Sequence, residues 1–197
     1  MYRVCAGREL VLASGSPRRR EMLAALGLAF VVRPVEVDET LDPAEDAARA
    51  AARLSLAKAR AARLAAGQAV LTADTLVGVA GRVLGKPADP AEAMKMLASL
   101  SGQEHQVLTG FCLGLGGEIF QGSAVSRVRF RALSPAEIAA YVATGEPLDK
   151  AGAYGVQGIG AALVEHIEGS YSNVVGLPLA AVVSLLLEKG VIEPSAG

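Results

Sequence analysis

A cluster of groups able to bind an anion lies between residues 14 and 20. The segment Ser14-Gly15-Ser16-Pro17-Arg18-Arg19-Arg20 combines a turn, a helix start and three guanidinium groups. Free N–H groups at a helix N-terminus favour negative charge, and arginine forks match phosphate oxygens. The segment therefore predicts a site for a phosphate-bearing anion. The alternative is a capped helix start whose arginines are solvated.

Asp74 is the second candidate for chemistry. It stands in Ala73-Asp74-Thr75, at the centre of an apolar run where a core would favour an aliphatic residue. Because a buried, unpaired carboxylate is costly, Asp74 should have a metal, a cationic partner or a place at an edge near solvent. The alternative is a plain turn between two strands. Thr75 could bind a ligand or its own backbone.

Three more charged residues stand in turns and on a helix: Glu39, Lys58 and Lys86. Each alone is typical of a solvated surface. The run from Gly81 to Lys86 does not match a P-loop, because Pro87 stands where Ser or Thr must meet the metal. The usual arrangements of kinases and GTPases are thereby excluded.

The segment 145–160 predicts a functional loop. It carries charged residues and five glycines, and it is too long for a mere connector. Loops of that kind tend to carry function, although a structural loop is the alternative.

Capping patterns predict the helices that must position these residues. Ser16 and Pro17 begin one helix, which Gly27 ends. A related pattern, a capping side chain followed by Pro, Ala and Glu, occurs three times, at Asp42, Asp89 and Ser134. These patterns predict helices over 43–66, 90–99 and 135–144, and a last helix begins near residue 178 and ends before residue 190.

Apolar runs predict the strands. We expect them at 10–13, on either side of Asp74 at 69–73 and 75–79, and then at 83–84, 105–113, 118–130 and 162–167. Glycines at 114–117 indicate a hairpin between the two longest strands. Because helices alternate with strands early and a long hairpin follows, the fold class is α/β, with a mixed sheet flanked by helices.

Composition limits the partners. The 197 residues suit one domain, or one domain with two lobes. The 19 Lys and Arg nearly balance the 20 Asp and Glu. A nucleic acid polymer is therefore not expected as a partner, whereas a small charged ligand is.

Three features of the sequence bear on the compartment. The two cysteines are too few for a disulfide framework, which favours a reducing compartment. Charges interrupt the N-terminus before a signal-peptide core could form. The apolar run 177–187 is too short to span a bilayer, so we expect no membrane association and a cytoplasmic location.

Several motifs together resemble the Maf family of nucleoside triphosphate pyrophosphatases. Their order and spacing hold over nearly the whole chain. The motifs are Ser14-Gly15-Ser16-Pro17-Arg18-Arg19, Ala73-Asp74-Thr75, Gly85-Lys86-Pro87, Ser101-Gly102 with His105, Glu146-Pro147 with Asp149-Lys150-Ala151-Gly152, and Gly169-Ser170 with Asn173 to Pro178.

The resemblance implies an architecture and partners. It implies an elongated mixed α/β fold related to inosine triphosphate pyrophosphatases, with a cleft between two lobes of one Maf-like domain over 1–197. It also implies a nucleoside triphosphate substrate, a divalent cation such as Mg²⁺ or Mn²⁺, and a homodimer.

The resemblance also assigns roles to residues. By motif, Asp74 would be the proton acceptor, and Arg18, Thr75 and Gln157 would be tied to substrate choice. The loop 153–158 looks like that of the branch acting on dTTP and UTP, which suggests modified pyrimidine nucleotides as well. Among the arginines, Arg18 is expected to reach toward the substrate, and Arg20 is expected to point elsewhere.

Elementary chemistry agrees with these roles and extends them. Ser14, Arg19, Lys58 and Lys86 would help to hold the triphosphate. Glu39 would join Asp74 as a metal ligand, because carboxylate oxygens suit Mg²⁺ and Mn²⁺. The carboxamide of Gln157 offers one donor and one acceptor to the edge of uracil or thymine.

Three alternatives stay open at this point. The same reaction could act on a modified purine nucleotide. The chain could instead be a non-catalytic, nucleotide-binding regulator of cell division, or a purely structural interaction module.

Overall fold

The computed structural model describes residues 1–42 and 44–195. Its main sheet has the strand order β3-β2-β4-β6-β7-β8, with β5 also paired to β4. The strands are β2 (Glu9–Leu12), β3 (Val31–Val32), β4 (Gln68–Val79), β5 (Arg82–Leu84), β6 (Glu104–Leu115), β7 (Glu118–Phe130) and β8 (Val164–Glu168). Both β3 and β4 run parallel to β2, whereas the other pairings are antiparallel. The predicted mixed sheet is confirmed.

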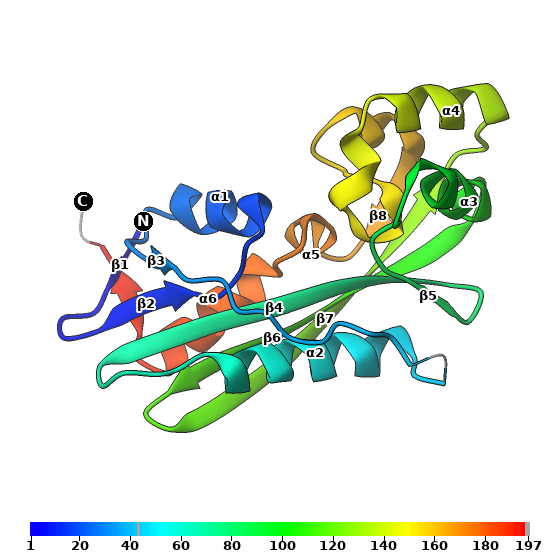
Figure 1. Ribbon diagram of the computed structural model, residues 1–197. Helices are drawn as coiled ribbons and strands as arrows, with labels where there is room; N and C mark the ends of the chain where they lie inside the picture. The colour runs from blue at the N-terminus through cyan, green and yellow to red at the C-terminus, as the bar shows by residue number, and fades with distance from the viewer. Residues whose placement is uncertain (43, 196–197) are drawn as a thin grey trace.

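Helices cover both faces of this sheet (Figure 1). Helix α2 lies along one face of β4 and β6, while α1, α5 and the segments containing α3 and α4 lie on the other side. The helices are α1 (Pro17–Ala25), α2 (Ala47–Ala61), α3 (Pro90–Leu100), α4 (Pro135–Ala143), α5 (Tyr171–Val175) and α6 (Leu179–Glu188), with short 3-10 helices η1 (Glu146–Asp149), η2 (Ala151–Ala153) and η3 (Ile159–Leu163). None of the helices in the described part of the chain is long and apolar enough to cross a membrane.

The chain ends meet in a second, small sheet. There β1 (Tyr2–Val4) pairs antiparallel with β9 (Ile192–Pro194), and both ends lie at the same end of the elongated molecule in Figure 1. The apolar patterns did not predict this sheet, because each strand is only 3 residues long.

Side-chain caps fix the starts of α1, α3 and α4 where the sequence places them. Ser16, Asp89 and Ser134 each accept a hydrogen bond from the backbone N–H three residues later. At Ser134 the carboxylate of Glu137 bonds back to the backbone N–H, which completes a capping box. These helices are confirmed, and α6 matches the predicted last helix within two residues.

The predicted helix over 43–66 is wrong at both ends. Asp46 rather than Asp42 caps α2, and the side chain of Asp42 instead accepts a backbone N–H bond two residues along, at 2.9 Å. Pro43 lies outside the described residues. At the other end the chain leaves the helix at Ala62, which lets Leu64 pack beneath the sheet against Val11, Ala13 and Val70.

Two strand predictions also need correction. Strand β4 is continuous, because its pairing with β6 runs from Ala69 to Gly78 without a break and sets Asp74 opposite Gly110. No turn separates its two halves. Strand β8 begins two residues later than predicted, because η3 occupies Ile159–Leu163.

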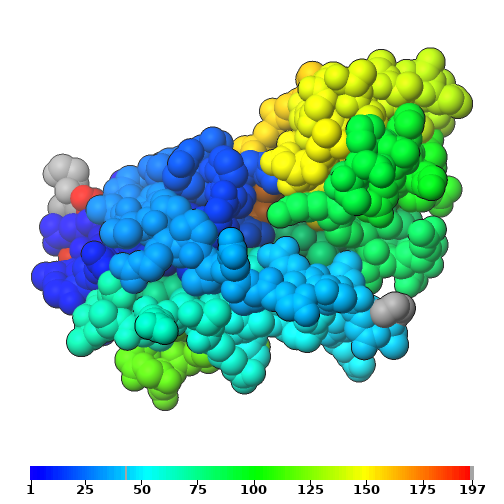
Figure 2. Space-filling view, in the orientation of Figure 1, coloured from blue at the N-terminus to red at the C-terminus, as the bar shows by residue number. Residues whose placement is uncertain are grey.

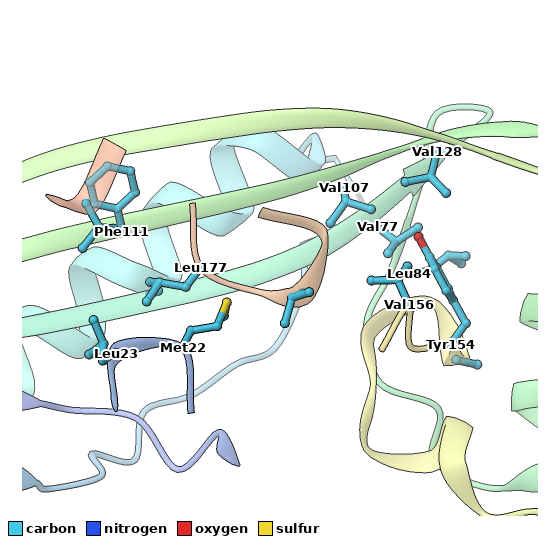
Figure 3. Packing of buried hydrophobic residues seen from close by; sticks show 14 of the residues in the cluster. Met22, Leu23, Val77, Leu84, Val107, Phe111, Val128, Tyr154, Val156 and Leu177 are labelled. Carbon is cyan, nitrogen blue, oxygen red and sulfur yellow. The ribbon is translucent and has the colours of Figure 1, made fainter. Parts of the chain in front are cut away.

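The main core cluster lies along one face of the sheet, and two groups of side chains within it can be followed. Figure 3 shows Met22, Leu23 and Leu177 near Phe111, and, further along the strands, a second group around Tyr154. The second group also contains Val77, Leu84, Val107, Val128 and Val156. These groups support the two ends of the molecule.

The other face carries a close contact between α2 and β6. A Cβ atom added at Gly110 would lie 2.5 Å from the backbone oxygen of Ala51, which is far too short. At Gly114, further along β6, an added Cβ would meet only the side-chain end of Leu64, at 3.1 Å. Gly110 therefore allows the backbone of α2 to rest directly on the sheet.

The difference between these two glycines is testable. Gly110→Ala should lower the free energy of unfolding by about 2 kcal/mol or more, because the helix backbone cannot rotate away as a side chain can. Gly114→Ala should cost less than about 1 kcal/mol. Urea denaturation measures both, and equal losses would contradict the close contact at Gly110.

His105 is buried beside Tyr154 and Phe130. Its Nε2 lies 2.8 Å from the Tyr154 hydroxyl oxygen, and its ring meets the edges of both aromatic rings. Burial lowers the pKa of His105 from 6.5 to about 4. The ring is therefore neutral in the folded protein at neutral pH.

This burial predicts a loss of stability in mild acid. Between pH 6.5 and about 4 the unfolded chain binds a proton at His105 that the folded protein does not, so stability falls as the pH falls. From pH 7 to pH 5 the loss should be about 2 kcal/mol. Urea denaturation of the wild type and of His105→Gln isolates this share. An identical pH dependence in both proteins would contradict it.

Candidate active site

The candidate site lies at a gap along one edge of β4. Strand β2 pairs with β4 only as far as Leu71, and β5 joins the same edge at Val77. Between these points no other strand in the described part of the chain covers that edge of β4. Side chains from both faces of β4 can therefore reach one opening, which explains how the adjacent Asp74 and Thr75 both line it.

The opening is a cleft of about 880 Å³. Figure 2 shows the hollow between the blue surface of α1 and the yellow and green surface at the other end of the molecule. The structure brings all the site residues predicted from the sequence into this cleft: Ser14, Arg18, Arg19, Glu39, Lys58, Asp74, Thr75, Lys86 and Gln157. Arg20 is exposed and does not line it.

A lysine lies between two carboxylates at one side of the cleft. The Lys58 ammonium is 2.5 Å from Asp74 Oδ1 and 2.7 Å from Glu39 Oε1, and the side chains of Lys58 and Asp74 are each only 11% exposed. Partial burial raises the pKa of Glu39, but the hydrogen bond and charge of Lys58 lower it by more. The pKa of Glu39 therefore lies below its ordinary value. The Asp74 charge is thus paired, as the sequence requires.

Arg19 is buried and fixes three elements to one another. Its Nε donates to the Gly176 carbonyl at 2.8 Å, and Nη1 donates to the Ala73 carbonyl at 2.8 Å and to Ser14 Oγ at 3.2 Å. Its Nη2 donates to Thr75 Oγ1 at 3.0 Å. The guanidinium therefore caps the open edge of β4 and links it to the start of α1 and the end of α5.

Arg18 points across the mouth of the cleft instead. Its Nη1 donates to Asp149 Oδ2 at 2.9 Å, and Lys150 Nζ contacts the other oxygen of the same carboxylate at 2.5 Å. Burial opposes ionisation of Asp149, yet Lys150 and Arg18 together hold the pKa of Asp149 below its ordinary value. The pair links α1 to the far wall.

The remaining predicted residues lie on that far wall. Lys86 follows Gly85, whose carbonyl accepts the Gly152 N–H at 3.0 Å and so ties this turn to η2. Gln157 is exposed, in the loop between η2 and η3. Both line the cleft.

Sequence reasoning gave no role to several residues that support the site. The Gly176 carbonyl is a backbone acceptor, which no side-chain pattern reveals. Thr109 is buried and lies 2.9 Å from Thr75, oxygen to oxygen. Asn173 is fully buried, and its amide donates to the Val107 carbonyl and to Ser126. A polar residue inside the apolar run 107–113 was the one available signal for Thr109.

The two carboxylates suit a divalent cation. Glu39 and Asp74 already converge on one positive charge, the Lys58 ammonium. No set of three or more His, Cys, Asp or Glu side chains within the described residues could hold a metal. A cation here would need additional oxygen ligands, which the phosphates of a ligand can provide.

The fold and the cleft define a class of protein. The fold is α/β, and its mixed sheet borders a cleft in which arginine and lysine side chains surround a paired carboxylate. This arrangement suits a small phosphorylated ligand. A family model described as Maf-like protein matches residues 9–189, and the chain belongs to this family. The resemblance inferred from the motifs is confirmed.

Relatives similar to this chain carry one name, dTTP/UTP pyrophosphatase. The protein of Moorella thermoacetica is 55% identical, and the match covers 93% of this chain and 96% of that protein. The protein of Anaeromyxobacter sp. (strain Fw109-5) is 54% identical, with 92% and 89% covered. The protein of Pyrococcus furiosus is 45% identical, with 91% and 94% covered.

Two solved structures are more distantly similar. A Ham1 protein of Staphylococcus aureus is 15% identical with a TM-score of 0.44, and the match covers 80% of each chain. A HAM1 protein of Coxiella burnetii is 19% identical with a TM-score of 0.43, covering 62% of this chain and 73% of that one.

The contrast between the two neighbouring arginines gives a prediction. Arg19→Lys should lower the free energy of unfolding by about 2–3 kcal/mol, because an ammonium cannot replace the guanidinium fork and buried acceptors lose their donors. Arg18→Lys should change it by less than about 1 kcal/mol, because its partner is largely exposed. Urea denaturation compares them. A larger loss at Arg18 would contradict the assigned geometry.

Proposed function

We propose that this chain hydrolyses dTTP and UTP, and modified pyrimidine nucleoside triphosphates, to the monophosphate and pyrophosphate. One observation carries the proposal: Asp74 lies in a cleft whose walls carry Arg18, Lys58 and Lys86, so a carboxylate faces the space where cations would hold a triphosphate. The shared name of the relatives supports pyrimidine substrates over purines.

Arg18 and Lys86 bind the triphosphate in this proposal, with Arg19 in a supporting role. Arg19 donates four hydrogen bonds to the protein, which leaves one of the five guanidinium donors for a ligand. Among the described residues, the Arg18 side chain bonds only with Asp149, at the mouth of the cleft, and it is 25% exposed. A phosphate can therefore compete for Arg18 far more easily than for Arg19. Ser14 contributes by holding Arg19.

Asp74 orients or deprotonates the attacking water. Lys58 contacts its Oδ1, while Oδ2 accepts no hydrogen bond from any residue in 1–42 or 44–195. That oxygen is free to accept a proton from a water placed in line with the α-phosphorus. The bond from the α-phosphorus to the bridging oxygen breaks, and the cationic side chains stabilise the charge on the departing pyrophosphate.

We propose Glu39 and Asp74 as the protein ligands of Mg²⁺ or Mn²⁺. Their convergence on one ammonium supports the site, and the ligand's phosphate oxygens complete the coordination. When bound, the cation supplies charge neutralisation on those oxygens.

Gln157 and Thr75 determine substrate choice in different ways. Gln157 projects its carboxamide from an exposed loop at the cleft, where one donor and one acceptor suit the uracil or thymine edge. Thr75 bonds to Arg19 and Thr109, so it acts through the placement of the guanidinium.

The proposal includes a setting for the reaction. The whole chain, residues 1–197, forms one domain with two lobes around the cleft, and two copies form a homodimer. The protein acts in the cytoplasm on free nucleotides rather than on nucleic acid polymers. A net charge of −1 and two unpaired cysteines support this setting.

Replacing the base tests the reaction. Asp74→Asn should lower kcat for UTP by about 10²–10⁴-fold, because the amide cannot accept the proton. Asp46→Asn, the same exchange at the cap of α2, should keep full activity, because Asn also caps helices. Ion-exchange chromatography of the products separates UMP, pyrophosphate and phosphate. Retained turnover in Asp74→Asn, or inorganic phosphate as the sole inorganic product of the wild type, would refute the mechanism.

A further inference from the structure

The carboxylate of Glu146 anchors the loop that carries Gln157. Its Oε1 accepts from the Gly160 N–H at 3.0 Å and from the Tyr141 hydroxyl at 2.8 Å, and its Oε2 accepts from the Ile159 N–H at 2.8 Å. The Tyr141 hydroxyl also accepts the Gly155 N–H at 3.2 Å. The backbone is thus held on both sides of Gln157.

Three glycines allow this close wrapping. A Cβ atom added at Gly158 would lie 2.4 Å from Glu146 Oε2, and one added at Gly160 would lie 2.4 Å from the Tyr141 hydroxyl oxygen. At Gly155 it would lie 2.7 Å from the Lys150 side chain. The loop therefore fits around the Glu146 carboxylate only because side chains are missing at these places.

Glu146 has the protonation state that this role requires. Partial burial raises its pKa, but hydrogen bonds from the Gly160 and Ile159 N–H groups and the Tyr141 hydroxyl lower it by more. The pKa of Glu146 therefore lies below its ordinary value. The ionised carboxylate only accepts hydrogen bonds, which matches the three donors around it. Because these three bonds go to the loop and to Tyr141, the carboxylate fixes the path of the loop.

Gln157 depends on this anchor for its direction. The side chain is exposed, and it makes no hydrogen bond with the described part of the chain. The path of the backbone from Gly155 to Gly160 therefore sets the position from which the carboxamide reaches toward the cleft. A loose loop would spread that carboxamide over many orientations.

We propose that Glu146 is a specificity-positioning residue: by fixing the loop 155–160 it aims Gln157 at the pyrimidine base. The inference rests on the proposed function. Arg18, Lys58 and Lys86 lie on other elements, and the three bonds of the Glu146 carboxylate go to Tyr141, Ile159 and Gly160 instead. Asp149, the partner of Arg18, lies in η1 with Glu146 but bonds through its own carboxylate.

Three variants test this role. Glu146→Gln replaces one acceptor oxygen by an N–H₂ group that faces backbone N–H donors. Tyr141→Phe removes one bond to the carboxylate and the bond from Gly155. Glu137→Gln is the matched control, because it makes the same exchange at the start of α4, the helix that carries Tyr141, where Gln also completes the cap.

The readouts separate base selection from phosphate binding. They are kcat/KM for UTP and for CTP with Mg²⁺ present, and the inhibition constant of inorganic tripolyphosphate, which has no base. Glu146→Gln should lower the UTP to CTP ratio of kcat/KM by about tenfold, since it disrupts charge-assisted hydrogen bonds. The tripolyphosphate constant should change by less than about twofold, because the Glu146 carboxylate bonds to the loop and to Tyr141 and not to Arg18, Lys58 or Lys86. Tyr141→Phe should move the ratio the same way by a smaller factor, and Glu137→Gln should leave it unchanged.

The outcomes distinguish the two levels of the proposal. A wild-type protein that turns over neither UTP nor dTTP refutes the proposed function and this inference with it. A wild type that prefers UTP, with an unchanged ratio in both Glu146→Gln and Tyr141→Phe, refutes the inference alone. Parallel losses in the ratio and in tripolyphosphate binding would also refute it, because they indicate general damage to the cleft.

Discussion

The ion pair between Lys58 and Asp74 is the interaction on which the rest of the structure depends. A buried carboxylate in the middle of a long strand is costly unless a cation pairs with it. Lys58 lies on α2 about two helical turns after Ala51, whose backbone rests on Gly110. Gly110 is the cross-strand partner of Asp74. The missing side chain beside Asp74 thus brings the helix close enough for its lysine to neutralise the charge.

Successive side chains of β4 point to opposite faces of the sheet, so the site includes groups from both faces. Thr75 points away from α2, toward Arg19 and the end of α5. Because β2 and β5 leave the edge of β4 uncovered between them, both faces open into the same cleft. A single stretch of strand can therefore supply the proposed base and, on its other side, hold a guanidinium near the phosphates.

Local patterns in the sequence were sufficient for most of the elements, whereas the set of residues that line the cleft followed from the resemblance of the motifs to the Maf family. Caps at Ser16, Asp89 and Ser134 are short-range interactions, so the helix starts followed from the sequence. The start of α2 did not, because Asp42 and Asp46 are both good caps and the choice between them depends on how the helix meets the sheet. The continuity of β4 through Asp74 did not follow either, because the partner of that carboxylate is Lys58, 16 residues away, which no local pattern identifies.

Side-chain direction was harder to predict than residue identity. Arg18 and Arg19 are adjacent on a helix, about 100° apart around its axis, and only the docking of α1 decides which one is buried. Arg19 has its main partners at Ala73 and Gly176, both backbone carbonyls far along the chain. The anchor at Glu146 depends on N–H groups in a loop of 3-10 turns, which residue types do not reveal.

The most direct test of the account follows the oxygen atom of the attacking water. Turnover of UTP in ¹⁸O-labelled water, with Mg²⁺ present, separates attack at the α-phosphorus from attack further along the chain of phosphates. Mass spectrometry of the products should find one ¹⁸O atom in UMP and none in pyrophosphate. Label in pyrophosphate, or in inorganic phosphate, would contradict attack at the α-phosphorus and with it the role proposed for Asp74.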